Sequence, residues 1–200
     1  MTSPRRYLAY GSNLHLEQMA QRCPNSTYLG LGILADYRWQ INQRGYANIV
    51  AAKDHHIQGL VYEIDAADEA RLDVNEGVAK KAYQKRLLPV FLRCAASNLY
   101  RRPVAWVVSN GGPKVLLGDS QQAWEPPTLE FDVLVYLSLD QVCDSEPKSE
   151  YVRRMNLGIA DARVLGVDED YIRDSIRPFI PRTDPARKDT AVSRDNHLKE

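Results

Sequence analysis

Short runs of β-branched and aromatic residues, each bounded by turn-forming residues, constrain this fold most. Such runs favour β-strands because these side chains pack well on a pleated, half-buried surface. We expect strands at residues 7–10, 28–39, 57–64, 83–92, 104–109 and 131–139, with a bend after the second. Most of the sheet is therefore predicted between residues 57 and 110.

Apolar residues at helical intervals lie between and after these runs. The segment 14–23 has Leu16, Met19, Ala20 and Cys23 at such spacing and precedes Pro24. A second helix is predicted over residues 66–75, where Asp65 is a suitable N-cap and Gly77 a terminator. Two further helices, at 149–158 and 168–176, are expected to join around Leu165 and Gly166. The chain is thus predicted to have an α+β fold.

The length and composition suit one compact domain. The chain has 200 residues and 44% hydrophobic content, which is enough for a single core. We place that domain at residues 1–180. Residues 181–200 contain prolines and charges of both signs with almost no apolar side chains, so we predict a flexible C-terminal tail there.

The charge balance limits the classes of partner. The 26 basic residues equal the 26 acidic ones, so no large net field would draw the chain to nucleic acid or to an anionic membrane surface. A small molecule or another protein is the expected partner, and a homodimer stays open.

Cysteine usage and apolar runs indicate the compartment. Cys23, Cys94 and Cys143 are widely spaced and match no metal-binding pattern, which is typical of reduced thiols. The N-terminus has no apolar stretch long enough for a signal peptide, and the longest apolar runs elsewhere are strand-sized. We therefore expect a cytoplasmic protein that neither spans nor binds a membrane.

The first chemical candidate is the loop Tyr10–Asn13, between a predicted strand and a predicted helix. Free backbone N–H groups and the positive end of a helix dipole meet at such a place, so a carboxylate is a natural occupant. Gly11 permits close approach, and Ser12 and Asn13 can add side-chain donors. An ordinary N-cap and turn explains the same residues, so the loop alone names no function.

The second candidate is Glu76, which lies at the end of a predicted helix directly before Gly77. Most glutamates in this position are simply solvated. However, the negative end of the helix dipole disfavours a carboxylate, and partial burial would raise its pKa further. A raised pKa suits general acid/base chemistry near neutral pH.

The two candidates together resemble a known family, the γ-glutamyl cyclotransferases, which include AIG2-like proteins. That family has a YGSNL loop near the N-terminus and a glutamate in an EGV segment, followed by a tyrosine and a strand. The resemblance spans about residues 5–180 and rests on Tyr10–Leu14, Gly59–Ile64, Glu76–Val78, Tyr83, Ser149–Met155 and Tyr171–Ile176.

The resemblance implies a small mixed β-barrel flanked by helices, with no cofactor and no metal. It implies that Glu76 is the catalytic base and that Tyr151 contacts substrate, with Tyr83 as a wall or hydrogen-bond donor. A packing role explains either tyrosine as well, and it explains Tyr83 more readily than Tyr151. The remaining implied substrate-binding residues, which would hold the α-carboxylate of a γ-glutamyl group, are Tyr7, Leu8, Ala9, Tyr10, Gly11, Ser12 and Asn13.

The implied reaction is lyase-type, releasing 5-oxoproline and a free amine from γ-glutamyl amino acids or related γ-glutamyl amides. A pathway-specific enzyme acting on a glutathione adduct or a protected biosynthetic intermediate is an alternative. The loop reads YGSN rather than the YGSL of glutathione-specific relatives, which makes intact glutathione a less favoured substrate. A non-catalytic binding protein is a third possibility, although it would be expected to lack Glu76. An unrelated interaction domain would require these ordered motifs to be coincidence.

Three other features carry weaker signals, and the first leaves open how the departing amine is bound. Residues 111–127 could form a lid or a surface loop. His55 and His56 are adjacent, without a third ligand at metal-binding spacing, so we expect a solvated turn there. Arg153 and Arg154 are expected on a solvated face, although one could contact a distant substrate carboxylate.

Overall fold

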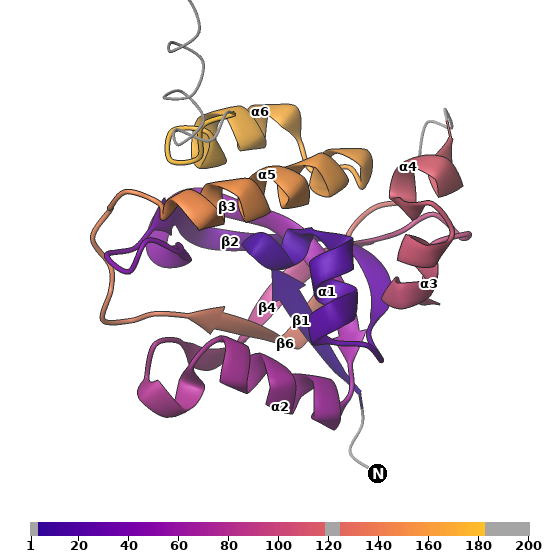
Figure 1. Ribbon diagram of the computed structural model, residues 1–200, viewed down its shortest axis with the longest axis horizontal. Helices are drawn as coiled ribbons and strands as arrows, with labels where there is room; N and C mark the ends of the chain where they lie inside the picture. Colours follow the sequence, from indigo (N-terminus) through magenta and orange to yellow (C-terminus); the bar gives the residue numbers. More distant parts are fainter. Residues whose placement is uncertain (1–3, 119–124, 183–200) are drawn as a thin grey trace, which may run out of the picture.

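The computed structural model describes residues 4–118 and 125–182, and its centre is a closed barrel (Figure 1). The strands are β1 (Arg5–Ala9), β2 (Thr27–Ile41), β3 (Ala47–Ile64), β4 (Gln84–Cys94), β5 (Arg102–Pro103) and β6 (Thr128–Leu137). Five of them follow the order β3-β1-β6-β4-β2 and close through a β2–β3 pairing, and β5 pairs with β2 outside the ring. The β1–β6 pairing is parallel and the other pairings are antiparallel. The expected α+β fold with a small mixed barrel is confirmed.

The β2–β3 hairpin is longer than the sequence indicated. Its register runs from Thr27 opposite Glu63 to Ile41 opposite Ala47. The first half of β3 was not predicted because residues 53–56 are exposed and polar, so no apolar alternation marks it. His55 and His56 therefore lie in a strand, and the turn expected there is wrong. No group of metal-ligating side chains occurs in the described part of the chain.

Residues 104–109 are a helix, α3 (Val104–Ser109), and the strand predicted there is wrong. Val104 and Val107 are both buried, one helical turn apart, on the face that packs near α1. Pro103 cannot donate a hydrogen bond to a sheet ladder, and packing at helical spacing outweighs the β propensity of valine. The sheet consequently extends from Arg5 to Leu137 instead of concentrating between residues 57 and 110.

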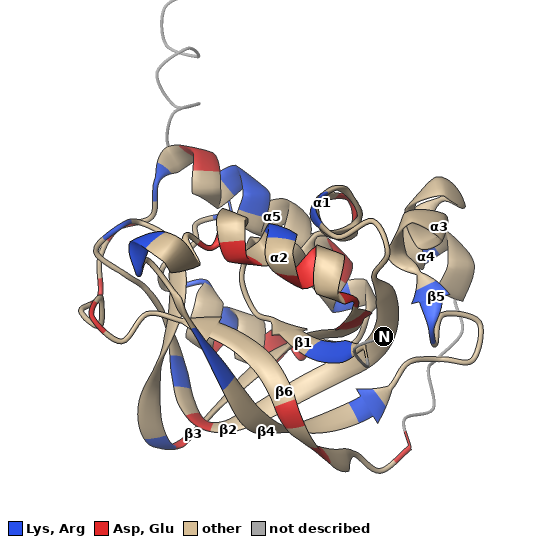
Figure 2. Ribbon diagram, turned by 90° about the horizontal axis from the view of Figure 1, so that it is seen from below, with Lys and Arg blue, Asp and Glu red and all other residues tan. Residues whose placement is uncertain are grey.

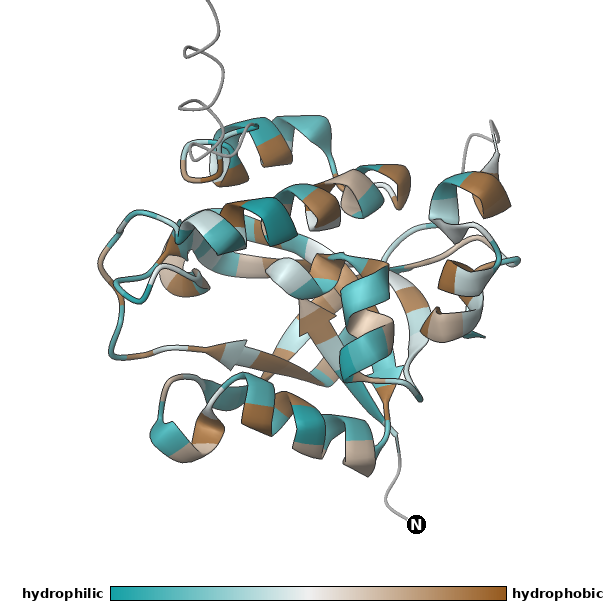
Figure 3. Ribbon diagram, in the orientation of Figure 1, coloured by the Kyte–Doolittle hydropathy of each residue, from teal (hydrophilic) through white to brown (hydrophobic). Residues whose placement is uncertain are grey.

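Helices cover the barrel on opposite sides (Figure 1). These are α1 (Leu16–Arg22), α2 (Ala66–Asn75), α5 (Ser149–Val164) and α6 (Glu169–Tyr171), the last continuing into a π-helical turn at Ile172–Ile176. In Figure 1, α5 and α6 lie above the barrel and α2 below it. Figure 3 shows hydrophobic and hydrophilic residues mixed along α5, as expected for a helix with one buried face. No helix of the described residues is long and apolar enough to cross a membrane.

The segment between α3 and β6 is partly helical. Residues 112–117 form α4 (Gly112–Leu117). This part of the segment 111–127 is therefore a helix and not a surface loop. Residues 119–124 of that segment lie outside the described residues, as do residues 183–200 of the predicted tail. Acidic and basic residues are interspersed over the strands and helices (Figure 2), in line with the net charge of zero.

Gly59 allows β3 to pass close to the end of β1. A Cβ atom at this position would lie 2.2 Å from the backbone oxygen of Ala9. Ala9 is the last residue of β1 and directly precedes the Tyr10–Asn13 loop. The small size of Gly59 therefore fixes both the barrel closure and the start of the loop.

We predict that Gly59→Ala destabilises the protein strongly. Overpacking against rigid backbone typically costs about 1–3 kcal/mol or more, and here the obstacle is a backbone oxygen that cannot rotate away. The control is Gly112→Ala, where a Cβ meets nothing within 4 Å but φ is +78°, so only about 1–2 kcal/mol is expected. Denaturant titration measures both free energies of unfolding. A smaller loss for Gly59→Ala than for Gly112→Ala would contradict the prediction.

Candidate active site

A cavity of about 210 Å³ opens where four segments meet. These are the loop after β1, the end of α2, the β2–β3 turn and the beginning of α5, and single residues of β1, α1 and β6 and the residue before β4 complete the wall. Its lining residues are Tyr7, Tyr10, Gly11, Ser12, Asn13, Arg22, Arg44, Tyr46, Ala47, Asn75, Glu76, Tyr83, Tyr136, Tyr151 and Arg154. Among these residues are six tyrosines, three arginines and a single carboxylate, that of Glu76. The volume is small for a ligand site, since such sites usually span about 300–1,000 Å³, so a compact ligand is favoured.

The end of α2 fixes Glu76. The helix begins at Asp65, whose side chain accepts a hydrogen bond from the Asp68 N–H group at 2.8 Å. It ends at Glu76, which caps the helix and donates its own N–H to the Leu72 carbonyl at 2.8 Å. Gly77 then takes φ = +64°, a left-handed conformation that glycine adopts without strain. The predicted capping and termination of this helix are confirmed.

The carboxylate of Glu76 is largely withdrawn from water. Its side chain is 19% exposed, and the nearest cation, Arg22, lies 3.9 Å away between Nη1 and Oε1. Burial raises the pKa of Glu76 above its ordinary value, and the positive charges of Arg22, Arg154 and Arg44 partly oppose this shift. No described residue donates a hydrogen bond to this carboxylate. It is therefore free to exchange a proton with a ligand.

Hydrogen bonds hold Asn13 rigidly in the loop. Its Nδ2 donates to the Tyr7 hydroxyl at 2.9 Å, while its Oδ1 accepts from Gln18 and Arg22, each at 2.9 Å. The Asn13 carbonyl also accepts a hydrogen bond from the Tyr62 hydroxyl at 3.0 Å. Because both ends of its side chain are occupied, Asn13 acts here as a structural support for the loop.

Ser12 and Gly11 complete the loop. The Ser12 Oγ accepts hydrogen bonds from Gln18 at 2.9 Å and from Arg154 at 3.3 Å. At Gly11, a Cβ atom would lie 2.9 Å from the Tyr151 hydroxyl oxygen. The backbone of Gly11 thus approaches the ring of Tyr151 more closely than another residue would permit.

The tyrosines of the cavity differ in how free their hydroxyls are. Tyr83 donates to the Ala47 carbonyl at 2.6 Å and accepts from Asn42 at 3.3 Å, so its proton is already committed to the backbone. Tyr10 donates to the Tyr136 carbonyl at 2.5 Å. Burial raises the pKa of Tyr151 to about 12, so its hydroxyl keeps its proton at neutral pH.

Most residues predicted for the site meet in this cavity. Tyr7, Tyr10, Gly11, Ser12, Asn13, Glu76, Tyr83 and Tyr151 all line it. Leu8 and Ala9 do not line it, and their side chains pack in the core at 0% and 1% exposure. No described residue of 111–127 lines it either, which gives no support to the lid considered for that segment.

Sequence reasoning missed several lining residues. Arg154 was expected on a solvated face, yet it borders the cavity and binds Ser12. Arg22, Arg44, Tyr46, Asn75 and Tyr136 were not singled out at all. Asn75 could have been found because it directly precedes Glu76, whereas the other four carry no local signal and reach the site only through folding.

A family comparison agrees with this geometry. The model of the family described as "Gamma-glutamyl cyclotransferase, AIG2-like" matches residues 7–125, which is more than half of the chain and includes the loop and Glu76. The chain therefore belongs to the gamma-glutamyl cyclotransferase, AIG2-like family. No curated protein matches it.

Solved structures share the fold at low sequence identity. A structure titled "Gamma-glutamyl cyclotransferase" is 17% identical with a TM-score of 0.59, and 85% of each chain is covered. The uncharacterized protein loc79017 from Homo sapiens is 18% identical with a TM-score of 0.59, covering 86% of each chain. YkqA from Bacillus subtilis is 17% identical with a TM-score of 0.55, covering 80% of this chain and 49% of its own. At such identities the similarity shows the fold alone.

The buried carboxylate gives a prediction about stability and pH. Since the pKa of Glu76 is raised in the folded protein, the native state holds this proton more tightly than the unfolded chain does. The contribution of the Glu76 carboxyl group to stability is therefore fully present below the ordinary pKa of 4.5. It is lost as pH rises through the native pKa. The side chain of Glu76→Gln does not ionise. We therefore expect its free energy of unfolding to increase relative to that of wild type as pH rises from 4.5 through the native pKa of Glu76.

Denaturant titrations of both proteins, from acid to neutral pH, measure this difference. The control is Glu17→Gln on α1, where the side chain is 61% exposed and does not line the cavity, so the gain that burial produces at Glu76 is not expected there. A Glu76→Gln variant whose stability relative to wild type falls as pH rises would contradict the prediction.

Proposed function

We propose that this protein is a γ-glutamyl cyclotransferase that converts γ-glutamyl amino acids or related γ-glutamyl amides to 5-oxoproline and a free amine. The observation that carries the proposal is the placement of Glu76. It is the one carboxylate among the described lining residues, it shares the cavity with the Tyr10–Asn13 loop, and burial raises its pKa. Family membership supports the same reaction class.

The substrate supplies its own nucleophile in this reaction. The α-amine of a γ-glutamyl group can fold back on the γ-carbonyl and close a five-membered ring, so no serine or cysteine nucleophile is needed. The protein must hold the chain in that folded form, and orientation of this kind can supply about 7–11 kcal/mol of the barrier. A small cavity walled by tyrosine rings suits this task.

Glu76 moves protons between the two nitrogens. It takes one proton from the α-ammonium, which frees the lone pair that attacks the γ-carbon. Once the new C–N bond has formed, Glu76 gives this first proton to the departing nitrogen and, ionised again, takes the second proton from the attacking nitrogen. The original C–N bond breaks as the oxyanion collapses to the ring carbonyl. Glu76 then passes the second proton to the released amine, which leaves as an ammonium while the ring keeps one N–H group.

The loop and its neighbours bind the rest of the γ-glutamyl group in this proposal. The Tyr10–Asn13 loop lines the cavity, and its free backbone N–H groups hold the α-carboxylate, with Arg22 beside the loop to balance the charge. The Tyr151 hydroxyl, still protonated at neutral pH, can donate to the oxyanion that develops on the γ-carbonyl. Tyr83 serves as a wall, since its hydroxyl is already committed.

We also propose that the protein works in the cytosol. Cys23 is buried, Cys94 and Cys143 are exposed, and none of the three forms a disulfide. Exposed free thiols persist most readily where the environment is reducing.

We predict that Glu76→Gln and Glu76→Ala fold but lose nearly all release of 5-oxoproline. General acid/base catalysis commonly contributes about 10²–10⁴-fold, so kcat should fall by about that factor. The assay is chromatographic measurement of 5-oxoproline from γ-glutamyl dipeptides, γ-glutamylamines and glutathione, with Glu17→Gln as the control that keeps activity. Near-normal turnover by either variant would contradict the mechanism. No product from any substrate with wild type would contradict the function and favour a binding protein.

We predict that Gly11→Ala impairs the reaction through its contact with Tyr151. The new methyl group would lie 2.9 Å from the Tyr151 hydroxyl, so the loop or the ring must move. We expect kcat/KM to fall by about tenfold or more, since a small misplacement of positioning groups is costly. Tyr151→Phe removes the clashing oxygen, and the double variant should therefore lose less than the two single losses combined. If the fold-loss of kcat/KM in the double variant equals the product of the two single losses, the two residues do not interact, which would contradict the prediction.

A further inference from the structure

The arginines of the cavity differ in what already neutralises them. Arg154 forms a two-pronged ion pair with Glu150, with Nε–Oε2 at 2.9 Å and Nη2–Oε1 at 3.1 Å. Arg22 lies 3.9 Å from Glu76 and donates to Asn13. The guanidinium of Arg44 makes no hydrogen bond or ion pair with any described residue. Its positive charge is therefore available to a ligand.

Two aromatic rings hold the Arg44 side chain in the cavity wall. Its Cζ lies 5.8 Å from the ring centre of Tyr46 and 5.6 Å from that of Tyr83. Cation–π contacts of this kind favour one placement of a guanidinium while leaving its N–H groups free to donate in its plane. A carboxylate can accept two such hydrogen bonds in parallel.

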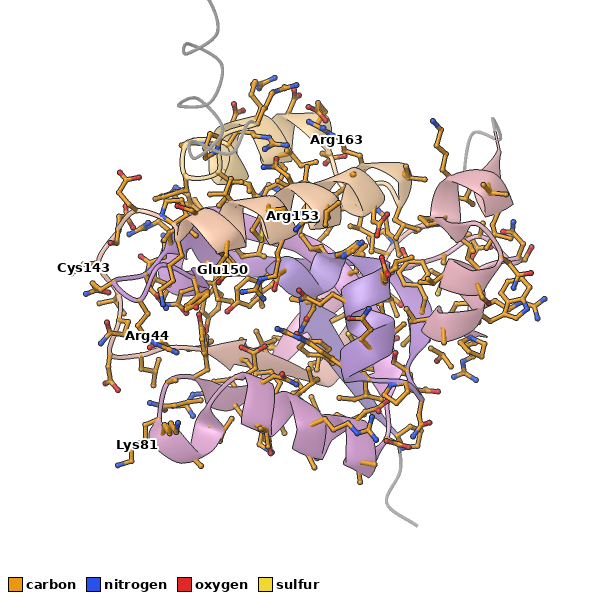
Figure 4. All side chains as sticks on the ribbon, viewed as in Figure 1. Arg44, Lys81, Cys143, Glu150, Arg153 and Arg163 are labelled. Carbon is orange, nitrogen blue, oxygen red and sulfur yellow. The ribbon has the colours of Figure 1, made fainter. Side chains whose placement is uncertain are left out.

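The backbone that carries Arg44 is also fixed. Arg44 lies in the β2–β3 turn, where the Asn42 Oδ1 accepts the N–H groups of Arg44 at 3.0 Å and Tyr46 at 3.4 Å. The next residue, Gly45, has φ = +81° and accepts a hydrogen bond from the Lys148 N–H at 3.2 Å. Figure 4 shows Arg44 at the outer side of the molecule, at a level between α5 and α2. The exposed guanidinium thus lies at the rim of the cavity and needs little reorganisation to bind.

The charges of the cavity can be matched to the parts of a substrate. A γ-glutamyl group brings one ammonium, for Glu76, and one α-carboxylate, for the loop and Arg22. These two charged groups of the substrate leave the guanidinium of Arg44 without a negative charge to pair with. A departing amine derived from an α-amino acid has a carboxylate one carbon from the scissile nitrogen, and this group would balance Arg44.

We propose that Arg44 determines specificity for the departing half of the substrate by pairing with a carboxylate on the released amine. This inference rests on the function proposed above and narrows it. The preferred substrates are γ-glutamyl derivatives of amino acids or peptides, and γ-glutamyl derivatives of uncharged alkylamines are poor ones. Arg44 binds the substrate but takes no part in proton transfer.

Two substrates that differ only in this carboxylate test the proposal. γ-Glutamylalanine and γ-glutamylethylamide have the same amide and the same departing carbon skeleton apart from that group. We expect wild type to favour γ-glutamylalanine in kcat/KM by about tenfold to hundredfold, since a hydrogen bond to a charged group contributes about 1.5–3 kcal/mol. Arg44→Gln should remove this preference by slowing γ-glutamylalanine while leaving γ-glutamylethylamide nearly unchanged.

The matched control is Arg153→Gln, because Arg153 is exposed on α5 and does not line the cavity. It should keep the wild-type preference. Arg44→Glu should reverse the charge preference, so that a γ-glutamyl derivative of ethylenediamine, which has a free ammonium, becomes better than γ-glutamylalanine. A purely structural role for Arg44 would lower activity on all three substrates equally and would overturn the proposal.

Calorimetric binding separates this proposal from the proposed reaction. Wild type should bind γ-glutamylalanine about tenfold or more tightly than γ-glutamylethylamide, and Arg44→Gln should bind the two alike. If the preference in binding is seen without 5-oxoproline release, the reaction is wrong and the role of Arg44 stands. If 5-oxoproline is released with no preference in binding or kcat/KM, the reaction stands and the role of Arg44 is wrong. Absence of binding by either compound would overturn the role of Arg44.

Discussion

The pairing of β1 between β3 and β6 is the constraint on which the rest of the structure depends. This strand of five residues closes the barrel, and its last residue, Ala9, passes so near Gly59 that no larger side chain fits there. The chain then leaves the barrel directly into the Tyr10–Asn13 loop. Because that exit point is fixed by the sheet, the loop reaches the cavity in one position. The site is thus a product of barrel closure.

The electrostatics of the cavity balance two opposing requirements. Burial favours the protonated form of Glu76, while nearby guanidinium groups favour the ionised form. If burial alone acted on this carboxyl group, its pKa would rise, and the group would keep its proton and be a poor base. If the arginines alone acted on it, its pKa would fall, and the group would be a poor acid. The combination suits a group that must accept a proton and then return it. The arginines are in turn restrained by Glu150, Asn13 and the tyrosine rings, so none of them forms a hydrogen bond to the carboxylate of Glu76.

The parts of the site that the sequence predicted are those with a local signal. The capping residue Asp65 and the terminating Gly77 define where α2 ends, and so locate Glu76. The loop after β1 is likewise marked by a glycine between a strand and a helix. Arg22, Arg44 and Tyr136 could not be found in this way, because only tertiary folding brings them together. The same reason explains the helix at Val104–Ser109, whose valines would favour a strand if local propensity alone decided.

The β2–β3 turn has a further consequence for how such an enzyme could diversify. The turn is held by Asn42 and Gly45, while the side chains of residues 43 and 44 are exposed and contribute nothing to the barrel core. Mutation at these two positions would therefore carry little risk of misfolding. If the proposed roles of Arg44 and Glu76 hold, natural selection, or a designer, could exchange the recognised amine at residue 44 while the proposed ring-closing chemistry at Glu76 stays intact. Substrate range and catalytic power would then evolve on separate parts of one small fold.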